Sequence, residues 1–73
     1  MQTDASATAI SAVLMRRIDG HERVIGYASK RLTPAQTRWS VIERELYAII
    51  FGLEKWEQYI YGKEVKVESD HQP

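Results

Sequence analysis

A chain of 73 residues is long enough for one small domain, and a domain of this size buries only about 60% of its unfolded surface. Its composition is globular, with 44% hydrophobic and 27% charged residues, and ten basic side chains balance ten acidic ones, so no basic excess points to a nucleic-acid partner. The absence of cysteine excludes disulfide bonds and cysteine-bound zinc, and no signal sequence or apolar run of about 18 residues predicts export or a membrane span. We therefore treat residues 1–73 as one domain, expected to be part of something larger.

Three strands are expected in the first part of the chain. Residues 1–6, with Asp4 at their centre, are predicted to form a short strand, and residues 9–17 carry apolar side chains on both faces, which is typical of a central strand. Asp19 and Gly20 then separate two apolar runs and predict a tight hairpin, because glycine supplies the positive φ that such a turn needs. Residues 22–30 are the returning strand.

The longest periodic stretch spans residues 40–62 and predicts one helix. Its start is marked by Ser40 and, three residues later, Glu43, a pair that can form a capping box. Gly62 predicts its end. Residues 34–39 are expected to be a connector in which a short helical turn fits.

Six apolar residues of this helix recur at steps of three and four and predict its buried face. They are Ile42, Leu46, Ile49, Leu53, Trp56 and Ile60. At about 100° per residue, Glu45 lies about 60° from the centre of this stripe, at the edge of the buried face. On the helix alone a solvated carboxylate is the commoner state, so only its neighbours can give Glu45 a function. A second apolar sector of Tyr47, Ile50 and Phe51 is expected to pack on other parts of a larger protein.

The last predicted strand covers residues 64–70. A helix of this length can serve as a crossover between parallel strands, so this strand is expected beside the first one, in a mixed sheet of order 3-2-1-4 with one long crossover helix. Adjacent strands lie about 4.8 Å apart, so Asp4 and Asp70 become neighbours, with Glu45 reaching them from the helix. Carboxylates crowded in this way repel one another unless a cation binds, and Mg²⁺ prefers oxygen ligands. The residues themselves therefore predict a site for divalent cations.

Strict alternation along the last strand conflicts with this convergence. It places Asp70 on the same face as Glu68 and opposite to Val67, which should pack against the helix. Asp70 would then point away from Glu45. A strand that ends or twists at Ser69 would remove the conflict.

Three segments of the chain carry a resemblance to a known family: TDAS at residues 3–6, YASKRLTPAQTRWSVIERELYAI at residues 27–49 and SDHQP at residues 69–73. In this order and spacing they resemble the ribonuclease H domain of reverse transcriptases from retrotransposons of the Ty3/gypsy type, nearly end to end. The resemblance implies an α/β ribonuclease H-like fold. Residues 1–73 would be its N-terminal portion, truncated before the fifth strand.

The resemblance also implies a chemistry. In this family four carboxylates bind two Mg²⁺ ions, for which Mn²⁺ can substitute, and hydrolyse the RNA strand of an RNA–DNA hybrid. By motif, Asp4, Glu45 and Asp70 would be the first three catalytic and metal-binding carboxylates, and the fourth is expected further downstream. Ala5 and Ser6, next to Asp4, are candidates for substrate contacts. Without the fourth carboxylate, the 73-residue chain alone is expected to be inactive or nearly so.

The implied partners are the RNA–DNA hybrid and the remainder of the reverse transcriptase polyprotein, in a cytoplasmic retroelement particle or in the nucleus. Ala9 and Ser11 stand where the family usually has glycines, and Trp39 replaces a common tyrosine. These departures leave open an alternative, a non-catalytic ribonuclease H-like interaction or structural module. A β-grasp-like binding domain is a weaker rival, and nothing in the sequence specifies an oligomeric state.

Three basic residues flank the connector at Pro34: Lys30, Arg31 and Arg38. They would either meet nucleic-acid phosphates or form a solvated cluster, and the sequence leaves both readings open. Solvation is the simpler state for both histidines, His21 in the hairpin turn and His71 next to Asp70, and support of the Asp70 carboxylate is the alternative for His71.

Overall fold

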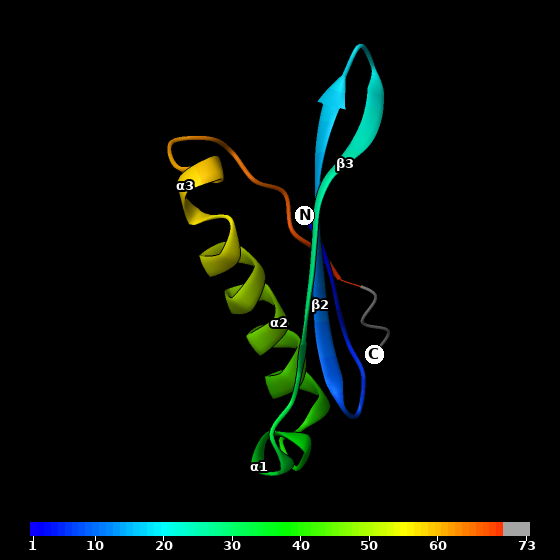
Figure 1. Cartoon of the computed structure of the whole chain (residues 1–73), viewed down its shortest axis with the longest axis vertical. Coiled ribbons are helices and arrows are strands. Elements are labelled where there is room, and N and C mark those ends of the chain that lie inside the picture. The colour runs from blue at the N-terminus through cyan, green and yellow to red at the C-terminus, as the bar shows by residue number, and fades with distance from the viewer. Residues whose placement is uncertain (70–73) are drawn as a thin grey trace.

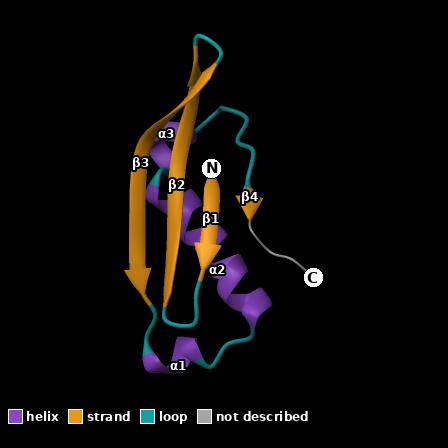
Figure 2. Cartoon of the chain, turned by 90° about the vertical axis from the view of Figure 1, so that its right-hand side faces the viewer, coloured by secondary structure: helices purple, strands orange, loops and turns teal. Residues whose placement is uncertain are grey.

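The computed structural model describes residues 1–69, and its elements follow the expected order (Figure 1). They are β1 (Gln2–Ala5), β2 (Ala9–Ile18), β3 (His21–Arg31), α1 (Pro34–Thr37), α2 (Val41–Lys55), α3 (Glu57–Ile60) and β4 (Glu68–Ser69). The described strands form one sheet in the order β3-β2-β1-β4, which confirms the predicted order 3-2-1-4 (Figure 2). The described helices all lie on one side of this sheet, and no described element covers the other side (Figure 1). Within residues 1–69, no helix is long and apolar enough to cross a bilayer.

The hairpin of β2 and β3 is the longest ladder of the sheet, and it turns where the sequence predicts. Asp19 has a φ of 52° and Gly20 a φ of 78°, so both adopt the left-handed conformation that a two-residue hairpin turn requires. Ile18 pairs with His21 directly across this turn. A register shift after Leu14 adds local twist, and the tip of the hairpin projects well beyond β1 (Figure 2).

β1 joins the two halves of the sheet. It pairs antiparallel with β2 along its whole length and parallel with β4, where Gln2 lies opposite Glu68 and Thr3 lies opposite Ser69. The chain reaches β4 only after passing through the helices, so the predicted crossover to a parallel neighbour is confirmed.

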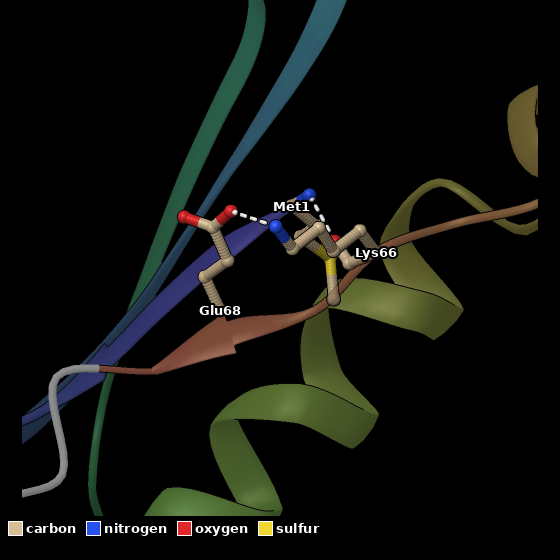
Figure 3. Close-up of polar contacts among 3 residues, drawn as sticks. All are labelled: Met1, Lys66 and Glu68. Carbon is tan, nitrogen blue, oxygen red and sulfur yellow. Dashed lines mark hydrogen bonds and ion pairs between the residues drawn. The ribbon is translucent and has the colours of Figure 1, made fainter.

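The predicted start of the last strand, at residue 64, was wrong, because β4 begins at Glu68. With Gln2 opposite Glu68, residues 64–66 run past the start of β1 and have no β1 residue opposite them. Two backbone hydrogen bonds hold the beginning of the parallel pair: the Met1 nitrogen donates to the Lys66 carbonyl at 2.7 Å (Figure 3), and the Glu68 N–H donates to the Met1 carbonyl at 2.9 Å.

The predicted start of the main helix is confirmed. The Ser40 hydroxyl accepts a hydrogen bond from the Glu43 N–H, and the Glu43 carboxylate accepts one from the Ser40 N–H, both at 3.1 Å. This reciprocal pair is the capping box that the sequence predicts. The short helical turn expected in the connector is α1, which is capped in the same way by Thr33 and Gln36.

The prediction of a single helix over residues 40–62 was wrong. α2 ends at Lys55, and Trp56 leaves the helical conformation with φ −114° and ψ 25° before the short helix α3 begins. The indole of Trp56 packs over β3: a Cβ added to Gly26 would lie 2.8 Å from its Nε1 atom. A contact between segments thirty residues apart leaves no mark on the apolar periodicity, so the sequence pattern could not place this break.

The predicted apolar stripe is confirmed only in its second half, where Leu53, Trp56 and Ile60 pack against the core. The fully buried residues of α2 are Ala48 and Gly52, whereas Ile42 and Leu46 of the stripe are 61% and 54% exposed. A Cβ on Gly52 would lie 2.9 Å from the Cβ of Ala12 in β2. The helix therefore lies so close to the sheet that only the smallest residues fit between them.

Two groups of buried residues form the core under α2. The first contains Met1, Ala12 and Leu14, and the second contains Ile10, Leu32 and Ala48. Tyr47 and Phe51 pack against the second group, so the expectation that they pack on another part of a larger protein was wrong. The third member of that sector, Ile50, is 51% exposed.

We expect the substitution Gly52→Ala to destabilise the fold. On an exposed helix surface this change stabilises by about 1 kcal/mol, but here the new methyl group meets Met1 Sδ at 2.6 Å and Ala12 Cβ at 2.9 Å. Because the Ala12 Cβ is attached directly to the backbone, we expect a net loss of about 1–2 kcal/mol in the free energy of unfolding, measured by urea denaturation. Lys55→Ala on the exposed side of α2 is the control, with a change below about 0.5 kcal/mol. An unchanged or raised midpoint for Gly52→Ala would contradict the close approach.

Candidate functional site

Asp4 lies on the open side of the sheet. Its neighbour Thr3 is only 4% exposed on the helix side, so strand alternation turns Asp4 to the other side, where it lies opposite Ser11 of β2. The Oδ1 atom of Asp4 accepts a hydrogen bond from the Ala5 N–H at 2.9 Å. No other hydrogen bond from residues 1–69 reaches this carboxylate, so its Oδ2 atom is available to a ligand.

Ala5 and Ser6, the candidates for substrate contacts, stand at the end of β1. The Ser6 hydroxyl accepts hydrogen bonds from the Thr8 N–H at 3.2 Å and the Ala9 N–H at 3.0 Å, and the Ser6 N–H donates to the Ala9 carbonyl at 2.8 Å. Ser6 thus shapes the turn between β1 and β2, a role that the sequence analysis missed. Substrate contact by these two residues stays a prediction.

Glu45 lies on the sheet-facing side of α2, near the carboxyl end of β1. It precedes the buried Gly52 by seven residues, about two helical turns, so the two share one side of the helix. α2 runs antiparallel to β1, because Gly52 approaches the start of that strand while Ala5 packs against the buried group that contains Ala48. Glu45, which is half-buried, lies about 4.5 Å further along the axis than Ala48. It therefore approaches the end of β1 that carries Asp4, but from the helix side of the sheet.

Asp70, the third predicted carboxylate, and its neighbour His71 lie outside the described residues. Within residues 1–69, no group of three histidine, cysteine, aspartate or glutamate side chains is placed to hold a metal ion. Asp4 and Glu45, two of the three predicted ligands, lie near the same end of β1 but on opposite sides of the sheet. The convergence of all three carboxylates stays a prediction.

A cavity of about 110 Å³ opens beside Asp4 on the open side of the sheet. Its lining residues are Gln2, Thr3, Asp4, Ser11, Val13 and Glu68. Glu68 brings a second carboxylate to this place, and it also forms an exposed ion pair with Lys66 at 3.4 Å (Figure 3). Glu68 was not among the predicted site residues. Strand alternation, which places Glu68 on the same face as Asp70, was the feature of the sequence that could have indicated it.

The donors around this cavity fit a hard divalent cation. Its lining includes the carboxylates of Asp4 and Glu68 and the hydroxyl of Ser11, and none of the lining residues is basic. Oxygen donors of this kind suit Mg²⁺ and Mn²⁺. The Lys66 ion pair is no obstacle, because an exposed pair of this kind contributes little free energy.

The fold and this end of the sheet define the class of protein. A mixed sheet of order 3-2-1-4, with a helical crossover to a parallel neighbour and an aspartate inside the first strand, is an α/β domain of the ribonuclease H-like type. The chain belongs to the family described as the RNase H-like domain found in reverse transcriptase, which it matches over residues 1–73. The resemblance drawn from its sequence segments is thereby confirmed.

Retrotransposon polyproteins are similar to this chain over nearly its whole length. The retrovirus-related Pol polyprotein from transposon opus of Drosophila melanogaster is 42% identical over 74 residues, which covers 100% of this chain. The Pol polyprotein from transposon gypsy of the same organism is 38% identical over 74 residues, again with 100% of the chain covered. The transposon Tf2-3 polyprotein of Schizosaccharomyces pombe is 35% identical over 74 residues and covers 97%. The chain spans only 7%, 7% and 6% of the lengths of these three relatives.

We expect Asp4→Asn to leave the stability of the fold nearly unchanged. The side chain is exposed, and an asparagine oxygen can still accept the hydrogen bond from the Ala5 N–H, so the free energy of unfolding should change by less than about 0.5 kcal/mol. Thr3→Asp is the contrasting variant, because it places a carboxylate one residue earlier, on the buried side of the same strand. It should cost about 3 kcal/mol or more in urea denaturation. Equal effects of the two substitutions would contradict the assigned faces of β1.

Proposed function

We propose that this chain is part of a ribonuclease H that hydrolyses the RNA strand of RNA–DNA hybrids with the help of divalent metal ions. The observation that supports this most is the parallel register of β1 and β4, in which Gln2 lies opposite Glu68 and Thr3 opposite Ser69. If the pairing continues by one residue, Asp70 comes to lie opposite Asp4, at a strand spacing of about 4.8 Å. Two carboxylates that close together favour the binding of a cation between them.

Asp4, Glu45 and Asp70 are the proposed metal ligands, and Mg²⁺ is the proposed cofactor, with two ions in the complete domain and Mn²⁺ as a substitute. When bound, such ions activate a water for attack on phosphorus and stabilise the leaving oxygen. The part of this chain is to fix the ligands: β1 holds Asp4, and the capped helix α2 holds Glu45. The crossover then returns Glu68 and Ser69 to the side of β1.

The proposed substrate contacts lie next to Asp4. Recognition of RNA depends on its 2′-hydroxyl groups, which are reached across the wide, shallow minor groove of an A-form duplex. Ser6 is exposed and immediately follows β1, so the turn that it shapes can approach this groove beside the carboxylates. The half-buried Ala5 would contribute its backbone rather than its methyl group.

The proposed setting is a reverse transcriptase polyprotein, the kind of protein in which similar sequences of opus, gypsy and Tf2-3 occur. The remainder of that polyprotein would be the partner of this chain and would supply the fourth carboxylate. The activity would take place in a cytoplasmic retroelement particle or in the nucleus.

A titration with Mg²⁺ followed by NMR tests the metal site directly. We expect chemical-shift changes confined to the surroundings of Asp4, Glu45 and Asp70, and Mn²⁺ should broaden the same signals because it is paramagnetic and takes the same oxygen ligands. Asp4→Asn should weaken this response strongly, because it removes a charged ligand while leaving the fold intact.

Asp19→Asn is the matched control for this titration. It removes one aspartate charge at the hairpin tip, far from the carboxyl end of β1, and asparagine tolerates the left-handed conformation found there. The metal response should persist in this variant. A wild-type chain with no response at Asp4 and Glu45 would favour the alternative function, a non-catalytic interaction or structural module.

We expect the 73-residue chain alone to show little or no Mg²⁺-dependent cleavage of an RNA–DNA hybrid, because one of the four carboxylates of the family would be missing. Cleavage of an end-labelled RNA strand, resolved on a denaturing gel, measures this. A longer segment of the same polyprotein should be active, and Asp4→Asn within it should lower the rate by more than about 100-fold. Robust turnover by the 73-residue chain would show that three carboxylates suffice.

A further inference from the structure

The charges of this neutral chain are unevenly distributed along the sequence. No aspartate or glutamate occurs between Glu22 and Glu43, although this stretch contains four basic residues. Three of them lie around α1, in the segment that leads from β3 into α2, at the end of the molecule toward which β1 points (Figure 2). They are Lys30, Arg31 and Arg38. Glu43, the first acid after this stretch, has its carboxylate engaged with the backbone of Ser40.

Lys30 belongs to a cluster with two aromatic residues, which we call the Lys30–Tyr47–Trp39 cluster. The ammonium group of Lys30 donates a hydrogen bond of 2.7 Å to the Tyr47 hydroxyl and lies 5.4 Å from the centre of the Tyr47 ring. The Trp39 ring meets the Tyr47 ring edge-on, with 5.5 Å between their centres, and remains 38% exposed. The hydrogen bond from Lys30 is the main cause of the lowered pKa of Tyr47.

The ammonium group of Lys30 is therefore held in place by Tyr47 and still has hydrogen-bond donors for a ligand. An ammonium group has three N–H donors, and within residues 1–69 only the one directed at Tyr47 has a partner. Fixing a long side chain beforehand lowers the entropy cost of binding. Two donors on a held cation beside an exposed indole ring match a phosphate oxygen with its neighbouring sugar or base.

This cluster lies on the flank of α2 opposite to Glu45. Tyr47 follows Glu45 by two residues, which is about 200° around the helix, and it packs toward Lys30 of β3, whereas Glu45 faces the β1 side. A helix with its side chains is about 10–12 Å across. A nucleic-acid duplex that lies across the start of α2, where Glu45 is, can therefore also reach the cluster.

We propose that Lys30 and Trp39, positioned by Tyr47, bind the sugar–phosphate backbone of the RNA–DNA hybrid beside the carboxylate site. This inference rests on the proposed function, since it takes the hybrid as the ligand. Lys30 would bind a phosphate, and Trp39 would pack against the adjacent nucleotide.

The chain contains a matched control for this cluster. Lys63 lies 4.9 Å from the centre of the Tyr59 ring, so it is also a lysine over a tyrosine, but it follows α3 at the other end of the helical layer (Figure 1). Lys63→Gln and Lys30→Gln remove the same charge from similar pairs. Only the second change should affect a contact near the carboxylates.

The test is the fluorescence anisotropy of an end-labelled RNA–DNA hybrid titrated with the 73-residue chain, in EDTA and at several salt concentrations between about 50 and 200 mM. Lys30→Gln should weaken binding by about three- to tenfold and lower the slope of log K against log salt by about 1, as expected for one lost phosphate contact. Lys63→Gln should leave both quantities nearly unchanged. Hybrid should quench the tryptophan fluorescence of the wild-type chain, and Trp39→Phe should abolish the quenching while Trp56 remains.

Equal effects of Lys30→Gln and Lys63→Gln, or no binding by the wild-type chain at the lowest salt, would overturn the proposal. Displacement by poly-glutamate as effective as by unlabelled hybrid would overturn it too, because it would identify an acidic protein surface as the ligand. Because EDTA removes metal ions, this outcome is independent of the metal titration. If only Lys30→Gln weakens binding and the metal titration shows no response, the proposed nuclease function would be wrong, whereas the proposed nucleic-acid contact would be supported.

Discussion

The close approach of α2 to the sheet is the constraint on which the rest of the structure depends. Gly52 lets the helix backbone lie against Met1 and Ala12, where even an added Cβ would collide, and the buried Ala48 packs with Ile10 and Leu32. The helix is thereby fixed over β1 and β2 and runs antiparallel to β1. Its direction brings Glu45 toward the carboxyl end of that strand. The position of a candidate ligand thus follows from two small residues that have no chemistry of their own.

The pairing of β1 with its two neighbouring strands places the other candidate ligand, Asp4. The four residues of β1 pair with β2 on one side, and within the described residues Gln2 and Thr3 pair with β4 on the other, so a segment from the start of the chain lies beside residues more than sixty positions later. The pairing with β4 starts at the backbone of Met1, and its register decides which residues of the two strands share a face. Since side chains alternate along a strand, Gln2, Asp4 and Glu68 fall on the same open side. A shift of one residue would turn Asp4 into the core.

The sequence was most informative where structure depends on neighbouring residues. The capping box at Ser40 and the turn at Asp19 and Gly20 are closed by contacts within a few residues, and both formed as predicted. The apolar stripe was right only in part: Leu53, Trp56 and Ile60 pack against the core, but Ile42 and Leu46 are exposed. At the closest approach of helix and sheet the buried residues are Ala48 and Gly52, which an apolar pattern does not single out. Trp56, where the helix breaks, packs over Gly26 of a distant strand, and local periodicity cannot reveal this contact. Asp4 could be chosen from sequence, but its face depends on which side the helix covers.

The charge balance is a second property whose meaning for function depends on the fold and not on the sequence alone. Ten basic and ten acidic residues suggest no attraction for a polyanion when they are only counted, yet the long-range field of a protein depends on where its charges lie. The stretch from Arg23 to Ile42 contains no acid, and the fold places the middle of this stretch at one end of the molecule. A hydrogen bond to Tyr47 holds Lys30 there, and the first acid that follows, Glu43, accepts a hydrogen bond from the Ser40 N–H. The acids predicted as metal ligands would themselves repel nucleic acid without cations nearby. A net charge of zero is therefore compatible with a basic segment at one end of the molecule, and a count of charges alone does not reveal such a segment.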